Sequence, residues 1–316
     1  MVFQTLHLLF QKGVPFKMQN TVKEHYVPQF YLKEFADESG KLHVYNFKSN
    51  KILRQSSSNI CFINNLYETK WENANPALGK YVRQNYIENI FSKYEGEFSK
   101  VLTQILRVCN PSQSTDALIL HGPERDLFFR FVVNMIVRNP ANMEAITLNI
   151  LKSNDIKNVE ANQIRTILEK MGIGGADAVF LAAKKQIMLT NEPENSFPQW
   201  CFERLREMNF VFFYAQTNSF ITGDIPVCMG DDPSILEEDK TSIYFALSPK
   251  VAVLFGNYVF FRNFKNHLVY IEEKLVDDYN CAFIKHQDSK QILIANSKAV
   301  IERYAKIMKS VRYGKH

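Results

Sequence analysis

Three polar residues, His25, Arg138 and Asp224, have the types and positions that hydrolytic chemistry needs. His25 precedes an apolar helix started by Pro28, and a histidine near the positive end of a helix stays neutral near physiological pH, which suits a general base or a metal ligand. Asp224 follows an apolar strand in FITGDIPV, where a carboxylate can hold a metal or orient the histidine. Arg138 ends an apolar helix, and its guanidinium can clamp a phosphate or a developing anion.

Each of these residues also has a structural interpretation. His25 can hydrogen-bond an exposed backbone group and so fix the direction of the chain before the helix. Asp224 can cap its own turn, because Gly-Asp-x-Pro is ordinary turn chemistry. Arg138 can satisfy the last carbonyls of its own helix or an internal carboxylate, because its charge is never given up. The sequence leaves both interpretations open.

Supporting polar groups accompany the three residues. The segment NNLYE contributes Asn65 and Glu68, and Thr222 opens the strand-end motif. Gly223 permits an unusual backbone angle or the close approach of a ligand. Whether a divalent metal is bound is left open, and His25 and Asp224 are the residues that would hold it. The sequence has no P-loop, Gly-x-Gly-x-x-Gly, Gly-x-Ser-x-Gly, His-Glu-x-x-His or Cys/His cluster, which disfavours the chemistry of those motifs.

One short match points to RNA cleavage but has the wrong context. RNFKNH, from Arg262 to His267, fits the Arg-x4-His pattern of the HEPN ribonucleases, in which both residues lie on a helix. Here the flanking segments are typical of β-strands, and NFKN is typical of a hairpin turn between them. The context therefore contradicts the motif.

The composition is that of a soluble globular protein, with 46% hydrophobic and 22% charged residues. The formal charge of +5 allows a nucleic acid or nucleotide substrate without requiring one. Five scattered cysteines, an odd number without paired spacings, indicate reduced thiols and a cytoplasmic protein. No apolar run is long enough to span a membrane.

The elements that must position these residues change in character along the chain. A strand is predicted at 41–47, and apolar periodicity predicts long helices over 75–109 and 123–138. Shorter helices are expected at 141–153, 160–171 and 176–189. Aromatic, β-favouring segments follow: FVFFYA, then FITGD after a hairpin-like turn at Gln216–Ser219, SIYFALSP, VAVLFGNYVFF, HLVYIEEKLV and CAFIKHQ.

This order predicts an α+β fold, with a helical middle packed against a mostly antiparallel C-terminal sheet. We expect residues 1–20 to be an N-terminal extension, with Met18 as the working start. We expect residues 21–316 to form a single α+β domain. Its parts are a helix-rich region at 21–190, a strand-rich region at 198–296 and a closing helix at 297–311.

Three segments together resemble a bacterial family known as domain of unknown function 4238. HYVPQFYLKEF matches its His-x-x-Pro-x-x-x-Leu-x-x-Phe opening at His25, Pro28, Leu32 and Phe35, and VRNP and FITGDIPV follow in the same order. The family's later motif is typically Thr-Ser-Asp-x-Pro, whereas this chain has Gly223 in place of the serine. The resemblance implies a bacterial, cytoplasmic protein in which His25, Arg138 and Asp224 occupy motif positions, but it brings no activity with it.

Two functions are consistent with these observations. The first is a hydrolase or nuclease-like effector of the toxin or phage-defence type, with His25 as general base, Asp224 holding a metal or orienting His25, and Arg138 binding a phosphate. The second is a non-catalytic module that binds a protein partner and uses the same motifs for packing. The first predicts that the three side chains converge in one pocket, and the second that each is satisfied within the core.

Overall fold

A computed structural model of the chain describes residues 21–71, 80–82, 84–111, 119–144, 162, 166, 169, 176–190, 197–231, 241–256, 265–285 and 291–313. The chain forms two compact units. Unit 1 contains Met1–Glu24, Ile63–Tyr94 and Pro140–Trp200. Unit 2 contains His25–Phe62, Glu95–Asn139 and Cys201–His316.

The described elements are, in chain order, β1 Lys23–His25, α2 Gln29–Lys33, β2 Leu42–Asn46, β3 Lys51–Gln55, the 3-10 helix η1 Ser57–Asn59, β4 Phe62–Asn64, α3 Tyr86–Val108, α4 Gly122–Val137, α7 Ala176–Leu189, α8 Phe197–Glu207, β5 Asn209–Ala215, β6 Thr222–Gly223, β7 Val227–Asp231, β8 Thr241–Ala246, β9 Val251–Gly256, β10 Leu268–Ile271, α10 Glu273–Lys285, β11 Ile292–Ala295 and α11 Lys298–Tyr313.

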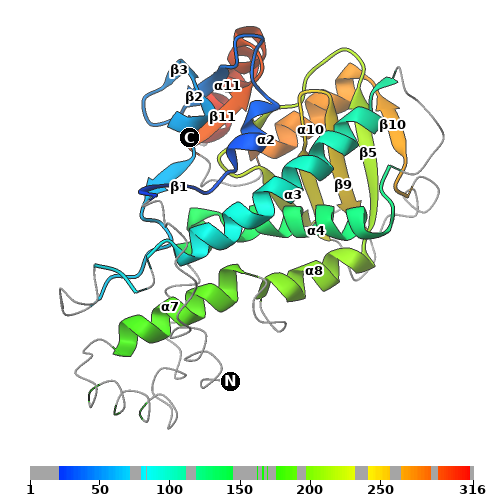
Figure 1. Cartoon of the computed structure of the whole chain (residues 1–316). Helices are drawn as coiled ribbons and strands as arrows, with labels where there is room; N and C mark the ends of the chain where they lie inside the picture. The colour runs from blue at the N-terminus through cyan, green and yellow to red at the C-terminus, as the bar shows by residue number, and fades with distance from the viewer. Residues whose placement is uncertain are drawn as a thin grey trace. The chain divides into compact units, whose positions relative to one another are not determined.

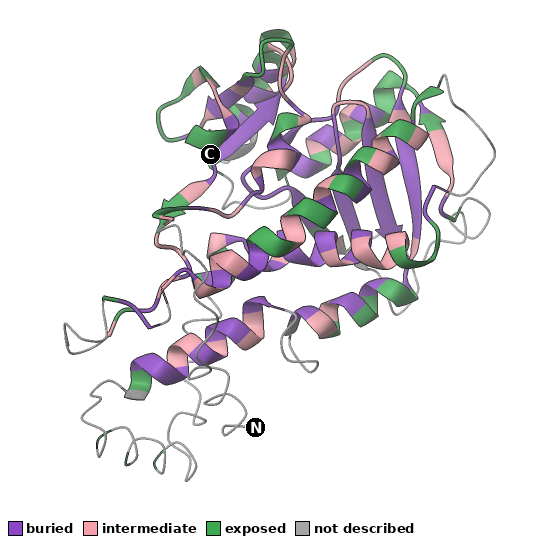
Figure 2. Ribbon diagram, viewed as in Figure 1, coloured by how far each residue is buried: buried purple, intermediate pink, exposed green. Residues whose placement is uncertain are grey.

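A five-stranded sheet forms the centre of unit 2, in the order β10-β5-β9-β8-β7 (Figure 1). β10 runs parallel to β5, and the other neighbouring strands are antiparallel. Every residue of β9 is buried, as Figure 2 shows, and so are four consecutive residues of β5, from Phe210 to Phe213. Such continuous apolar strands are stable only where helices cover both faces of the sheet.

Aromatic side chains of α4 cover one face of this sheet and those of α10 cover the other. Residues of each strand alternate between the two faces, so Phe212 and Phe213 of β5 meet different helices. The ring contacts and their centroid distances are Phe128–Phe212 5.9 Å, Phe129–Phe210 5.3 Å, Phe131–Phe245 5.6 Å, Phe213–Tyr279 5.3 Å and Tyr244–Tyr279 5.3 Å. The core of unit 2 is therefore largely aromatic.

A second, antiparallel sheet has the order β3-β2-β11-β6, and α11 packs on it. β6 has only two residues, and its Gly223 is opposite Leu293 of β11. A Cβ atom on Gly223 would lie 2.6 Å from the carbonyl oxygen of Ile292, and the φ angle of Gly223 is outside the left-handed region. Glycine is needed here because another strand approaches closely, and not because of its backbone angle.

The predicted α+β class, with mostly antiparallel sheets, is confirmed. The short helix after Pro28 is α2, whose Tyr31 and Leu32 are fully buried, as is Phe35 just after it. The helices expected at 123–138 and 176–189 are α4 and α7, and the closing helix is α11. The single domain over 21–316 stays a prediction. The extension at 1–20, and most of the helices expected at 141–153 and 160–171, lie outside the described residues.

Three local predictions were wrong. Gln216–Ser219 does not close a hairpin, because β5 and β6 belong to different sheets. NFKN does not join neighbouring strands, because β10 pairs with β5 and not with β9. CAFIKHQ begins inside α10, whose buried residues Val276, Asn280, Phe283 and Ile284 recur at helical spacing. That pattern is visible only when the segment is read from Glu273.

The close approach at Gly223 predicts that Gly223→Ala lowers the free energy of unfolding by about 1–3 kcal/mol, because the strands must separate to admit the methyl group. Gly96→Ala is the control, since Gly96 lies in α3 with no atom within 4 Å of the added carbon. That change should raise the stability by about 0.5–1 kcal/mol. Urea unfolding of both variants measures the difference, and equal stabilities would contradict the prediction.

Candidate functional site

Arg138 is fully buried and bonds to groups from three segments of unit 2. Its Nη1 lies 2.6 Å from Oε1 of Glu95 in α3 and 3.4 Å from Oδ1 of Asn134, one turn earlier in α4. Its Nη2 donates to the backbone carbonyl of His25. A buried guanidinium must be paired, and Glu95 supplies the charge.

His25 and Arg138 thus meet, but through the backbone of His25. The imidazole ring of His25 packs against Phe62, with 5.6 Å between the ring centroids. Burial raises the pKa of the neighbouring Cys61 thiol well above its ordinary value, and the charge of Asp224 contributes to that rise.

Asp224, only 5% exposed, caps the start of β11. Its Oδ2 accepts a hydrogen bond of 2.9 Å from the N–H of Gln291, and its Oδ1 accepts one of 3.3 Å from the N–H of Ile292. These bonds fix the strand that pairs with β6. The geometry is that of a structural cap on another segment and not of an Asx turn within its own loop.

Thr222 joins the second motif to the first. The hydroxyl of Tyr31 donates to the carbonyl of Ala246 at 2.7 Å, and the hydroxyl of Thr222 lies 2.6 Å from the same Tyr31 oxygen. Because the single proton of Tyr31 goes to Ala246, Thr222 is the donor to Tyr31. All three groups are in unit 2, and Tyr31 and Thr222 have no exposed surface. The motif segments therefore meet by packing.

A different set of polar residues lies inside unit 1. The carboxyl groups of Glu24 and Glu68 each influence the pKa of the other. Within the described residues, Oε1 of Glu24 is buried and has no hydrogen-bond partner. Glu24 has no exposed surface, and its Oε2 accepts a hydrogen bond of 2.8 Å from the N–H of Tyr67. Glu68 is half-buried, and its Oε1 accepts a hydrogen bond of 2.6 Å from the N–H of Asn85. Lys185 of α7 is 3.2 Å from the backbone carbonyl of Glu68.

Two left-handed asparagines place this carboxyl pair. Asn65 has a φ of 55° and turns the chain after β4, so that Glu68 follows three residues later. Asn85 has a φ of 57° immediately before α3, and its N–H points to Glu68. Asparagine tolerates this backbone region better than most residues. Glu24 lies inward because β1 alternates, with Lys23 exposed and Glu24 buried.

The burial of these groups changes their protonation. Burial raises the pKa of Glu24 to about 8. The hydrogen bond from the N–H of Tyr67 lowers this pKa in part, whereas the charges of Glu68 and Glu88 add to the rise. Burial also raises the pKa of Glu68, and the hydrogen bond from Asn85 partly offsets that rise. Burial lowers the pKa of Lys185, and the charge of Glu68 partly offsets that fall. At neutral pH Glu24 therefore holds its proton. A buried carboxyl beside other carboxyls titrates in this way.

A cavity of about 20 Å³ adjoins Glu68, and this is roughly the space that one water molecule needs. Its walls include Glu68, Thr69, Tyr86 and Gln186. Thr69 is 6% exposed, and within the described part of the chain its hydroxyl has no hydrogen-bond partner. A buried hydroxyl costs free energy unless it is hydrogen-bonded, so this cavity is polar enough for water.

The described residues contain no group of three or more His, Cys, Asp or Glu side chains arranged to bind a metal ion. Nor do they include a helix with both the length and the apolarity to cross a membrane.

A family model described as protein of unknown function (DUF4238) matches residues 23–299. The chain belongs to this family. The DUF4238 match begins one residue before Glu24 and spans Glu68, Asn85, Lys185 and the three motif segments. No curated protein and no solved structure matches the chain significantly.

The sequence singled out Asn65 and Glu68 but missed Glu24 and Lys185. Glu24 was overlooked because the interpretation of Lys-Glu-His concentrated on His25. The structure shows that Glu24 is the one buried residue of the three-residue strand β1. Lys185 follows Ala178 and Ala182 on the buried face of α7, and a lysine on an apolar stripe is the pattern that could have identified it.

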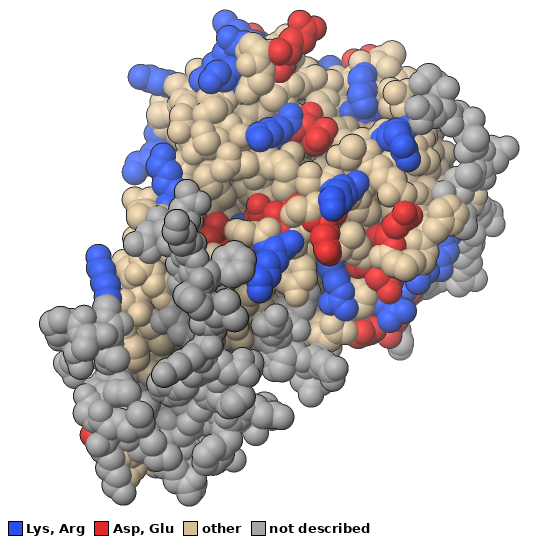
Figure 3. Space-filling model, in the orientation of Figure 1, with Lys and Arg blue, Asp and Glu red and all other residues tan. Residues whose placement is uncertain are grey.

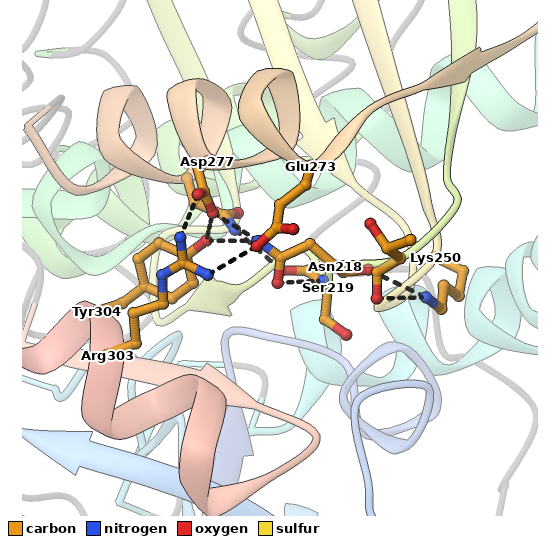
Figure 4. Close-up of polar contacts among 9 residues, drawn as sticks. Asn218, Ser219, Lys250, Glu273, Asp277, Arg303 and Tyr304 are labelled. Carbon is orange, nitrogen blue, oxygen red and sulfur yellow. Dashed lines mark hydrogen bonds and ion pairs between the residues drawn. The ribbon is translucent and has the colours of Figure 1, made fainter.

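The sequence also missed a second polar cluster in this DUF4238 protein, which belongs to unit 2 (Figure 4). Asp277 of α10 accepts from Asn218 and from Tyr304 of α11, each at 2.5 Å, and also pairs with Arg303. The ammonium of Lys250 lies 3.5, 3.4 and 3.1 Å from three successive carbonyls, those of Gln216, Thr217 and Asn218. The cluster clamps the loop between β5 and β6 and has its charges matched.

The buried ion pair predicts that Arg138→Met lowers the free energy of unfolding by about 3 kcal/mol, because Glu95 loses its partner and the His25 carbonyl its donor. Arg204→Met is the matched control. Arg204 makes an ion pair of 3.1 Å with Glu207, but both side chains are exposed. Its effect should be within about 0.5 kcal/mol. Chemical denaturation measures both, and similar losses would contradict the prediction.

The raised pKa of Glu24 predicts a pH-dependent stability. Its folded pKa, about 8, exceeds its ordinary value of 4.5, so the native state binds the extra proton. The stabilisation is fully present below pH 4.5 and is lost as the pH rises through 8, with a slope of up to about 1.4 kcal/mol per pH unit.

Glu24→Gln keeps the shape and the acceptor for Tyr67 and should remove that slope. Glu97→Gln, on an exposed position of α3, should leave it unchanged. Denaturant titrations between pH 4.5 and 8.5 give the slopes. An unchanged slope in Glu24→Gln would show that Glu24 ionises normally.

Proposed function

We propose that this chain is a hydrolase in which Glu68 is the general base and Glu24 is its proton-bearing partner. One observation carries the proposal: the half-buried carboxyl of Glu68 borders a water-sized cavity and directly follows Tyr67, whose N–H donates to the wholly buried carboxyl of Glu24. Pairs of titratable groups whose environments separate their protonation are typical of acid–base sites. On this proposal the chemistry takes place in unit 1, on Glu68, and His25, Arg138 and Asp224 have structural roles.

The geometry supports a simple sequence of proton transfers. A water molecule in the cavity gives a proton to the Glu68 carboxylate as its oxygen attacks an electrophilic carbon. Asn85 N–H, at 2.6 Å, holds one oxygen of Glu68 in place, and Lys185 holds its backbone. Glu24 keeps Glu68 oriented and shares the proton with it. When the bond to the leaving group breaks, that proton passes to the leaving group, which restores Glu68.

The charges of the site favour an uncharged substrate, an amide or an ester. The charges of Glu68 and Glu88 both raise the pKa of Glu24, and Lys185 is the neighbouring cation. A phosphodiester would bring further negative charge to this excess of carboxyl groups. On the face of unit 2 that Figure 3 shows, Lys and Arg side chains are interspersed with Asp and Glu side chains, whereas a nucleic-acid surface concentrates basic residues.

The setting that we propose is the bacterial cytoplasm, in an effector of the toxin or phage-defence type. All five cysteines are free, and Cys61, Cys109 and Cys228 are buried, which suits a reducing compartment. A nuclease or phosphodiesterase that acts on a nucleic acid through His25, Arg138 and Asp224 is the second enzymatic proposal. It is motivated by the contact of Arg138 with His25.

A non-catalytic module that binds a protein partner is a separate proposal, favoured by the partners of the motif residues. Glu95 neutralises Arg138, and Asp224 caps backbone N–H groups. On this proposal His25→Ala lowers the melting temperature but leaves intact any cellular effect of the protein that remains folded.

Hydrolysis assays separate these proposals. The purified chain is tested on fluorescent casein and p-nitrophenyl acetate as amide and ester probes, and on bis-p-nitrophenyl phosphate and single-stranded RNA as phosphodiester probes. We expect amide or ester cleavage that falls at least about 100-fold in Glu68→Gln, the usual contribution of a general base. Glu24→Gln should shift the pH profile of cleavage, and His25→Gln should leave cleavage nearly unchanged.

Circular dichroism confirms that each variant is folded, and Glu97→Gln serves as the matched control. Cleavage of RNA or of the phosphate diester that is lost in His25→Gln but kept in Glu68→Gln would overturn the proposal in favour of the nuclease. Amide or ester cleavage that persists at full rate in Glu68→Gln would also overturn it.

A further inference from the structure

A groove of about 440 Å³ lies in unit 2 between α11 and the β2–β3 hairpin. Tyr45 and Ile52 line it from the hairpin, and Ala305, Lys306 and Lys309 line it from α11. The volume is in the range of sites that hold small organic ligands. Neither of the enzymatic proposals above uses these residues.

The groove carries an excess of positive charge. Lys306 and Lys309 are three residues apart on α11 and therefore share a face. Glu302 also lines the groove, but its carboxylate is 3.6 Å from the ammonium of Lys298. Across the described ranges, neither Lys306 nor Lys309 pairs with a carboxylate. Two neighbouring ammonium groups attract a dianion such as a phosphate monoester.

The floor of the groove is firm and partly apolar. Tyr45 is 2% exposed, and its hydroxyl donates 2.9 Å to Oδ1 of Asn50, which turns the hairpin with a φ of 52°. The ammonium of Lys309 lies 5.8 Å from the centre of the Tyr45 ring, which holds the lysine at the edge of the groove. Ile52 and Ala305 provide apolar surface beside it.

We propose that this groove binds a small organic phosphate of about the size of a nucleoside monophosphate. The phosphate lies between the ammonium groups of Lys306 and Lys309, and the uncharged part of the ligand covers Ile52 and Ala305. The apolar floor favours an organic phosphate over the inorganic ion, and the volume limits the ligand to about one nucleotide.

Isothermal titration calorimetry with adenosine 5′-monophosphate as the probe tests the site in the full chain. We expect binding that is at least tenfold weaker in the double variant K306Q/K309Q and less than twofold weaker in Lys274→Gln. Lys274 is the control, because it is exposed on α10 and does not line the groove. Glutamine keeps a high helix propensity, so the variants should fold.

Two further titrations identify which part of the ligand is recognised. Adenosine should bind at least tenfold more weakly than the monophosphate, and so should inorganic phosphate. Affinity for the monophosphate should fall as salt is raised, because the contact is between charges. Equal binding of adenosine, equal binding of inorganic phosphate, undiminished binding to the double variant, or no binding of the monophosphate at millimolar concentration would each overturn the proposal.

Discussion

A fully buried guanidinium is the constraint around which unit 2 is organised. Arg138 has no exposed surface, and a charge removed from water in this way is tolerated only if an opposite charge and hydrogen-bond acceptors surround it. Glu95, Asn134 and the carbonyl of His25 meet that requirement, which fixes the end of α4 against α3 and against the last residue of β1. α4 then presents three phenylalanines to the five-stranded sheet.

The opening motif and the strand-end motif meet by packing, and this explains why both could be recognised from the sequence while their roles could not. Proline before an apolar run predicted α2, and Tyr31 and Leu32 are indeed buried. The bond from Thr222 to Tyr31, however, joins residues 191 positions apart. No local pattern carries such a pairing. The same limit applies to Asp224, whose partners Gln291 and Ile292 lie 67 and 68 residues away.

The α+β class could be predicted from the sequence because several segments are long enough to show the apolar spacing of a helix or the composition of a strand, such as α7 and the aromatic run of β5. The pairing of the strands could not be predicted, because β6 is only two residues long and pairs with β11, which is distant in the sequence. In the candidate site, Glu68 and Asn65 were visible as a polar turn beside an aromatic. The pairing of Glu68 with Glu24 was not visible, because it depends on two asparagines with positive φ that bring three segments of unit 1 together.

The two units accommodate buried ionisable side chains in different ways. In unit 2 the charge of Arg138 is cancelled by the ion pair with Glu95. In unit 1 the buried carboxyl of Glu24 lies near other carboxyl groups, and its raised pKa lets it hold a proton near neutral pH. A fold that needed only stability would favour an apolar pair at these positions. We therefore propose that Glu24 and Glu68, beside a polar cavity, are placed for chemistry and not for packing.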